Sequence, residues 1–145
     1  MDTGLSHMEW FRRKDGGVMI SEVGARPPGA QIVSLISWAH GIDFYKAWAR
    51  VVVCEEFVPP ERRYAAGIAY LRGQGKGAKV ARVIGVEEAQ RELGALVVES
   101  KLPVVGQAHS TSYEGDGFVI LRHPETAVVE KGLKRLVTLV RVELE

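Results

Sequence analysis

The chain has 145 residues, a length that suits one domain or two small ones and allows roughly two thirds of the unfolded surface to be buried. Hydrophobic residues at 46% and charged residues at 26% are typical of soluble globular proteins and exclude extended disorder. Nineteen basic and eighteen acidic side chains leave a formal net charge of +1, so we expect no nucleic-acid partner.

The single cysteine limits the kinds of site that the chain can hold. Cys54 excludes an internal disulfide and any CxxC metal site, which favours a reducing, cytoplasmic setting. We expect Cys54 itself to be a buried small hydrophobic residue. Apolar runs such as residues 51–54 are too short to span a bilayer, so no membrane partner is expected. No apolar stretch with a small-residue cleavage site follows Met1, and no export signal is predicted.

A β-hairpin is the first element that the sequence predicts. Residues 6–13 and 18–23 have the composition of short strands, and Asp15-Gly16 between them is typical of a two-residue turn. After the hairpin, apolar residues at helical spacing predict a helix over residues 30–40. The N-terminal part is therefore expected to run from strands into helices.

Two residues mark the boundary between this helix and the next. Gly41 is placed to end the first helix, and Asp43 is placed to cap a second helix that fades near residue 54. The two prolines at residues 59–60 then break the pattern.

The second half of the chain mixes strands and helices. Residues 64–72 and 78–84 are strand-like and flank a glycine-rich run at residues 73–77, which predicts a second hairpin. The other expected elements are a helix at residues 86–93, strands at 95–102 and 117–121, a helix that opens at Pro124, and a closing strand at 140–144.

This mixture lacks regular β-α-β alternation, so the predicted fold class is α+β. We expect two units, residues 1–58 with the first hairpin and its helices, and residues 59–145 as a small mixed domain. Trp10, Trp38 and Trp48 are expected to anchor the core, since two of them lie on apolar helix faces.

The predicted register of the first hairpin places two acidic side chains opposite each other. With a two-residue turn, counting outward along the strands pairs Glu9 with Glu22. Like charges about 5 Å apart destabilise an antiparallel pair, unless one is protonated or a cation lies between them. Oxygen ligands with no cysteine nearby favour a hard ion such as Mg²⁺, which takes one or two carboxylates and substrate phosphates. The alternative is two solvated glutamates on an exposed face, and a longer turn would separate them.

Arg26 lies in a restricted segment just after the second strand. Glycines and prolines within residues 24–29 limit the backbone, so the guanidinium can aim at a phosphate or a carboxylate. The alternative is an arginine exposed on a connecting loop.

Other candidate residues have weaker patterns. The run at residues 73–77 lacks the spacing of a phosphate-binding loop and is expected to be a flexible turn. His7, His40, His109 and His123 are scattered, and none is predicted to bind metal or to act as a base.

Three stretches of the N-terminal part resemble the end of an ATP-grasp domain. They are residues 7–11 (HMEWF), residues 15–16 (DG) and residues 20–32 (ISEVGARPPGAQI). In that family one strand carries a metal-binding glutamate and the next carries a glutamate-x-asparagine-x-arginine motif. The helix that follows often leads into a stretch similar to residues 39–43 (AHGID).

The resemblance implies a role for each matching residue. Glu9 and Glu22 would hold the Mg²⁺ ions that bridge the ATP phosphates, and Arg26 would contact the phosphate or the acyl-phosphate intermediate. Phe11 would line the adenine pocket. The sequence departs from the family pattern at Gly24, which stands where the motif has asparagine and supplies no side-chain oxygen.

The resemblance also extends to the second half. Residues 64–145 are similar to the small C-terminal domain of ATP-grasp carboxylate-amine ligases, biotin carboxylase-like enzymes and the large chain of carbamoyl phosphate synthase. Only eight residues precede Glu9, whereas these enzymes carry further domains before this hairpin. We therefore expect the chain to be the C-terminal portion of such an enzyme, with Met1 either an artificial start or an internal methionine.

The resemblance implies an ATP-dependent ligase. Such an enzyme activates a carboxylate as an acyl phosphate for attack by an amine, with ATP and Mg²⁺ as cofactors and a small carboxylate as substrate. We expect this chain alone to be inactive, and a homodimer is a further expectation. The alternative is a non-catalytic interaction or oligomerisation module derived from the same fold.

Overall fold

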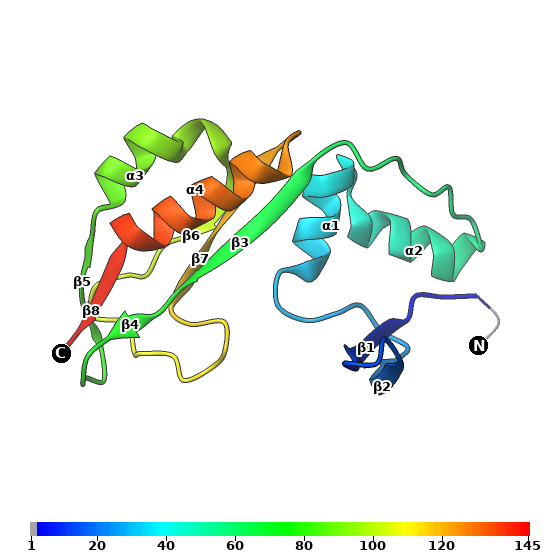
Figure 1. The fold of residues 1–145 in the computed structure, drawn as a ribbon, viewed down its shortest axis with the longest axis horizontal. Helices are drawn as coiled ribbons and strands as arrows, with labels where there is room; N and C mark the ends of the chain where they lie inside the picture. The colour runs from blue at the N-terminus through cyan, green and yellow to red at the C-terminus, as the bar shows by residue number, and fades with distance from the viewer. Residues whose placement is uncertain (1–2) are drawn as a thin grey trace.

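The structure is a computed structural model that describes residues 3–145. Its N-terminal part consists of a β-hairpin followed by two helices (Figure 1). The predicted elements are confirmed here, and their bounds are β1 (His7–Arg12), β2 (Val18–Gly24), α1 (Ile32–His40) and α2 (Phe44–Cys54).

Local chemistry explains where the two helices begin and end. Helix α1 starts two residues later than predicted because Ala30 has a φ of +52°, which is not helical. Gly41 ends α1 in the left-handed conformation, with φ +66°. The Asp43 side chain then caps α2 by accepting a hydrogen bond from the Lys46 backbone N–H.

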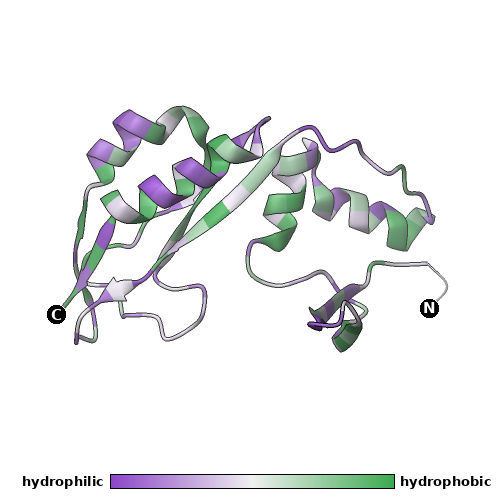
Figure 2. Ribbon diagram, in the orientation of Figure 1, coloured by the Kyte–Doolittle hydropathy of each residue, from purple (hydrophilic) through white to green (hydrophobic). Residues whose placement is uncertain are grey.

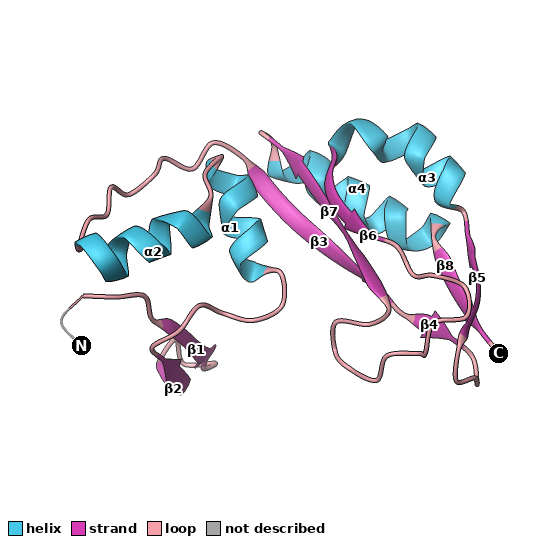
Figure 3. Cartoon of the chain, turned by 180° about the vertical axis from the view of Figure 1, so that it is seen from behind, coloured by secondary structure: helices cyan, strands magenta, loops and turns pink. Residues whose placement is uncertain are grey.

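The second half forms two small sheets with two helices packed on them (Figure 3). The α+β class is confirmed. The bounds of its elements are β3 (Ala65–Leu71), β4 (Gly73–Gln74), β5 (Val80–Ile84), α3 (Val86–Leu93), a 3₁₀ turn (Gly94–Leu96), β6 (Val97–Lys101), β7 (Gly117–His123), α4 (Thr126–Leu139) and β8 (Arg141–Leu144).

The second predicted hairpin is wrong. Strands β3 and β5 lie in different sheets, because the C-terminal strand β8 lies between β4 and β5 and pairs with both. Strand β3 pairs instead with β7, in a sheet of order β3-β7-β6. The glycine-rich run carries no signal for pairing with a strand at the end of the chain. The local pattern therefore predicted the wrong partner for β3 and for β5.

The sheet β3-β7-β6 is covered on both faces. On one face Ala65, Ala69, Val119 and Leu121 are buried in the core that α3 and α4 complete. The alternation of a strand puts Ile120 on the other face, where α1 contacts β3 and β7. Ile120 is fully buried and Val33 of α1 is 1% exposed.

Aromatic and charged side chains join α1 to this sheet. The Arg122 guanidinium of β7 lies 5.3 Å from the ring centroid of Trp38 in α1 and 4.4 Å from that of Tyr64. The Trp38 indole N–H donates to a Glu99 carboxylate oxygen at 2.8 Å. The carbonyl of Ala39 accepts from the backbone N–H of both residue 63 and Tyr64. These contacts fix where β3 starts relative to the end of α1.

The structure corrects two predictions about the core. Cys54 is exposed at the end of α2 rather than buried. Trp10 is 50% exposed on the hairpin, and Trp38 and Trp48 are only partly buried. The three tryptophans therefore do not form the core, which consists of alanine, valine and leucine side chains, most of them from the strands and helices after residue 64.

We predict that Gly85→Ala destabilises the chain by about 3 kcal/mol or more. Gly85 precedes α3 with φ +81°, and an added Cβ would collide with the Leu139 carbonyl oxygen. Gly41→Ala is the matched control, because Gly41 also has a positive φ but a Cβ there meets nothing within 4 Å. Its cost should be about 1–2 kcal/mol. Equal losses in urea unfolding of the two variants would contradict the prediction.

Candidate functional site

The turn of the first hairpin is one residue longer than predicted. The Arg13 N–H donates to the Gly17 carbonyl at 2.8 Å, and the Gly16 N–H donates to the Arg13 carbonyl at 3.0 Å. Gly16 has φ +87°, as a three-residue turn of this kind requires. The strands then begin with Arg12 opposite Val18. This register, if continued, would place Ser21 opposite Glu9.

A β-bulge restores the predicted pairing of the two acids. The register shifts by one residue between Trp10, which pairs with Ile20, and Glu9, which pairs with Glu22. Ser21 is the extra residue. The predicted pairing of Glu9 with Glu22 is therefore confirmed. It arises by a different route from the predicted one, because the extra residue in the turn and the extra residue at the bulge have opposite effects on the register.

The bulge also decides which side chains share a face. Without it, Glu22 would lie on the face of Ile20, because side chains alternate along a strand. With it, Glu22 lies opposite Glu9, and Phe11 and its partner Met19 fall on the same face as these acids. Glu9 and Glu22 have side chains that are 58% and 53% exposed.

Arg26 lies beside the acid pair. Its Nη2 is 3.3 Å from Glu22 Oε1, and its Nη1 donates to the Pro27 carbonyl at 3.1 Å. His7 Nε2 is 3.9 Å from Glu9 Oε1. The structure thus brings together Glu9, Glu22 and Arg26, and it leaves all three open to solvent. An exposed surface of two carboxylates and one guanidinium can bind a cation and an anion side by side.

The two carboxylates of Glu9 and Glu22 fit a hard metal ion whose other ligands are phosphate or water oxygens. Among residues 3–145, no group of three or more histidine, cysteine, aspartate or glutamate side chains is placed to hold a metal. Two facing carboxylates still match Mg²⁺, which is usually bound by one or two carboxylates plus phosphates and water. A Cβ at Gly24 would lie 3.9 Å from Glu22 Oε1. A side chain at position 24 would therefore point toward the same place.

A second polar centre, which sequence reasoning missed, surrounds Asp116. Its buried carboxylate accepts the backbone N–H groups of Gly73 at 2.8 Å and Ser110 at 2.7 Å, and lies 3.1 Å from His109 Nδ1. Burial by itself raises the pKa of Asp116, but these three hydrogen bonds outweigh it and lower the pKa. The only signal in the sequence is a single aspartate between two glycines, a composition typical of a turn.

Asp116 fixes a loop that reaches the segment after Arg26. Glu114 belongs to this loop, and one of its carboxylate oxygens lies 3.5 Å from Nε2 of Gln31, in the segment after Arg26. A Cβ on Gly29 would lie 3.6 Å from the Tyr113 hydroxyl. The backbone carbonyl of Tyr113 accepts from the Arg72 guanidinium. Asp116 therefore has a positioning role, since its oxygens are occupied by protein donors.

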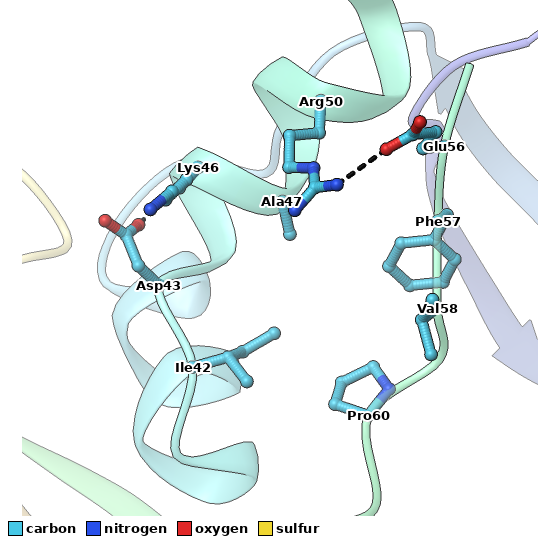
Figure 4. Close-up of a pocket in the computed structure, with 9 residues that line it drawn as sticks. All are labelled: Ile42, Asp43, Lys46, Ala47, Arg50, Glu56, Phe57, Val58 and Pro60. Atoms are coloured by element: carbon cyan, nitrogen blue, oxygen red, sulfur yellow. Dashed lines mark hydrogen bonds and ion pairs between the residues drawn. The ribbon is translucent and has the colours of Figure 1, made fainter. Parts of the chain in front are cut away.

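A groove of about 720 Å³ lies along α2, and neither Glu9 nor Glu22 is among the residues that line it (Figure 4). Three of its charged groups already have partners within the chain: Asp43 caps the helix, and Arg50 pairs with Glu56 at 2.6 Å. Its apolar lining comes from Ile42, Ala47, Phe57, Val58 and Pro60. None of the residues predicted to form the site lines this groove.

Comparison with known proteins identifies the fold. The chain is similar to the L-amino acid ligase from Bacillus licheniformis, with a TM-score of 0.78 and 21% identity over 98% of this chain. It is also similar to the N5-carboxyaminoimidazole ribonucleotide synthetase from Thermotoga maritima, with a TM-score of 0.69 and 20% identity over 99% of this chain. A third match is the phosphoribosylglycinamide synthetase from Anaerococcus prevotii, with a TM-score of 0.68 and 15% identity over 97% of this chain.

These matches cover 37–38% of the length of the three enzymes. No family model matches the sequence, and the search of curated proteins found no significant match. The predicted resemblance to the C-terminal portion of an ATP-grasp enzyme is therefore confirmed at the level of the fold. Within residues 3–145, no helix is both long enough and apolar enough to cross a membrane.

We predict that Asp116→Asn lowers the free energy of unfolding by about 1–3 kcal/mol at neutral pH, because an amide N–H₂ would face N–H donors. The folded-state pKa is lowered below the ordinary value of 3.8. The wild-type advantage is thus complete above that value and is lost as the pH falls through the lowered pKa. Urea unfolding measured from neutral pH to about pH 2 tests both effects.

Asp15→Asn is the control for this experiment. Asp15 also accepts a backbone N–H, from Gly17, but its side chain is 62% exposed. A pH dependence of stability that Asp116→Asn leaves unchanged would contradict the role given to Asp116.

Proposed function

We propose that this chain contributes the metal-binding hairpin and an anion-binding arginine to an ATP-dependent ligase that activates a carboxylate as an acyl phosphate. The observation that carries the proposal is the pairing of Glu9 with Glu22 beside Arg26, on a chain with the C-terminal fold of ATP-grasp enzymes. The matched enzymes are named as a ligase and two synthetases, which supports the general class of reaction.

Each residue has a distinct task in this proposal. Glu9 and Glu22 would hold Mg²⁺, and the metal, when bound with ATP, would offset the charge on the phosphoryl group. Arg26 exchanges its contact with Glu22 for the transferred phosphate or the acyl phosphate. Phe11, 62% exposed on the same face, offers an aromatic surface for the adenine.

The chemistry of the proposed reaction has two steps. A carboxylate oxygen of the substrate attacks the γ-phosphorus, which forms the acyl phosphate and releases ADP. An amine then attacks the acyl carbon and releases phosphate. Arg26 is the group of this chain that would stay with the phosphate through both steps, because its planar guanidinium suits a phosphoryl oxygen pair.

The second candidate function is a non-catalytic interaction module. It is favoured by the limited share of the matched enzymes that the chain covers and by the exposure of both acids. A binding measurement separates the two, because a module that only kept the hairpin as a scaffold would not bind a divalent ion at Glu9 and Glu22.

We predict that Glu9→Gln raises the free energy of unfolding of the metal-free chain by about 0.2–1 kcal/mol, because it removes repulsion from Glu22. Excess Mg²⁺ should stabilise the wild-type chain by mass action and should have a smaller effect on the variant. Gly24→Asn, which adds an oxygen beside Glu22, should strengthen the response. The measurement is thermal unfolding with chelator and with Mg²⁺.

Glu61→Gln serves as the matched control, since Glu61 is an exposed glutamate in a segment outside helices and strands. It should leave the response to Mg²⁺ unchanged. The proposal fails if wild type is more stable than Glu9→Gln in chelator, or if both proteins respond equally to Mg²⁺.

We predict that the chain alone does not turn over ATP, because the matched enzymes are longer than the part it covers. Phosphate release in the presence of Mg²⁺ and ATP should equal that of Glu22→Gln. Turnover by the wild-type chain above this variant would show that residues 1–145 hold a complete nucleotide site, and the proposed division of the site would be wrong.

A further inference from the structure

A polar contact joins the segment before α1 to the loop between β6 and β7. The part of this loop that leads into β7 is largely hydrophilic (Figure 2). Nε2 of Gln31, one residue before α1, lies 3.5 Å from Oε2 of Glu114 in the loop, and both side chains are partly buried. This distance is longer than that of an ordinary hydrogen bond, so the contact is weak. We call the two side chains the Gln31–Glu114 pair.

Neither side chain of the pair has the partner that its chemistry requires. The carboxylate of Glu114 forms no ion pair among residues 3–145. Arg72, which reaches the same loop, donates to the backbone carbonyl of Tyr113. The amide oxygen of Gln31 is buried and accepts no hydrogen bond from the described residues. Both an unpaired carboxylate that is partly buried and a buried acceptor without a donor cost free energy. The pair therefore lacks a cationic hydrogen-bond donor.

The pair lies close along the chain to the arginine of the candidate site. Gln31 follows Arg26 by five residues, and two prolines at residues 27–28 restrict the backbone between them. Glu114 is fixed from the other side, because the buried carboxylate of Asp116 accepts two backbone N–H groups and holds the loop in place. Ligand sites are common where two units of a fold meet. The pair is thus a fixed polar point beside the segment that carries Arg26.

We propose that Glu114 and Gln31 bind the primary ammonium group of the amine substrate, an assignment that rests on the proposed function. A primary ammonium carries one positive charge and three N–H donors, so it neutralises Glu114 and donates to both side chains. The Gln31 amide turns about its last side-chain bond, whose torsional preference is broad, and presents its oxygen to the ammonium. This turn breaks only the 3.5 Å contact, because the amide oxygen has no partner to lose. Two charge-assisted hydrogen bonds replace that contact.

A divalent metal ion and a water molecule are the competing ligands, and both fit the pair less well. One carboxylate balances the charge of an ammonium, whereas half of the charge of Mg²⁺ would stay uncompensated. Among residues 3–145, no group of three or more acidic, histidine or cysteine side chains completes a metal site. A water molecule satisfies the amide oxygen of Gln31 but leaves the charge of Glu114 unpaired. An ammonium meets both requirements.

The test is an NMR titration of the full chain in which methylammonium chloride replaces tetramethylammonium chloride at constant ionic strength. Both ions carry one positive charge, but only methylammonium has N–H donors. The side-chain amide signals of Gln31 and the carboxyl carbon signal of Glu114 should shift together and saturate. Shifts that do not saturate would mean that only water and bulk salt reach the pair, and they would overturn the proposal. Saturation of the Glu114 signal by Mg²⁺ and not by methylammonium would overturn it in favour of a metal.

Variants of the pair show where methylammonium binds. Glu114→Gln keeps the size of the side chain and removes its charge, so it should raise the dissociation constant about tenfold or more, as the loss of a hydrogen bond to a charged group implies. Gln31→Leu should raise it to a smaller extent. Glu61→Gln, at an exposed glutamate outside helices and strands, should leave it unchanged. Equal dissociation constants for wild type and Glu114→Gln would contradict the assignment.

The amine site and the proposed metal site give separate results. Mg²⁺ is proposed to act at Glu9 and Glu22, so its effect on the thermal unfolding of Glu114→Gln should match its effect on wild type. A wild-type chain that responds to Mg²⁺ but does not bind methylammonium would overturn the amine site alone. A chain that binds methylammonium but does not respond to Mg²⁺ would support the amine site and contradict the metal site.

Discussion

Arg122 lies over the rings of both Trp38 and Tyr64, and the arrangement of the chain depends on this contact. Trp38 belongs to α1, Tyr64 precedes β3, and Arg122 is part of β7. A guanidinium over an aromatic ring contributes about 0.5–2 kcal/mol, depending on how far it is shielded from water. Helix α1 also contacts β3 and β7, and Val33 of α1 and Ile120 of β7 are both buried, which adds apolar burial to the same interface. Together these contacts hold α1, which connects the hairpin to α2, against the sheet.

The candidate site is connected to the C-terminal sheets by a second set of contacts. The segment after Arg26 leads directly into α1, and Gln31 meets Glu114 on the loop that Asp116 fixes. Because the buried carboxylate of Asp116 accepts protein N–H groups from two separate segments, this loop has a defined position. The polar centre at Asp116 therefore supports the site without needing to touch a substrate.

The two faces of the hairpin carry different kinds of side chain, charged groups suited to binding on one and apolar groups on the other. Its acidic face is suited to a cation and a phosphate, and its other face carries apolar side chains that a folded core would normally cover. A one-residue bulge at Ser21 produces this division, because it moves Glu22 from the apolar face to the acidic one. Small changes of register thus have large consequences for which residues can meet.

The sequence by itself determined the elements whose signals are local. Side-chain chemistry and spacing within a few residues account for the Asp43 cap, the Gly41 stop and the helix at residues 86–93. Strands β1 and β2 also lie where their composition predicts. Only the tertiary structure decided that β8 separates β4 from β5, that Trp10 stays exposed, and that Asp116 is buried. These outcomes depend on residues distant in the sequence, and the pairing energy of two remote segments leaves no trace in the local pattern of either one.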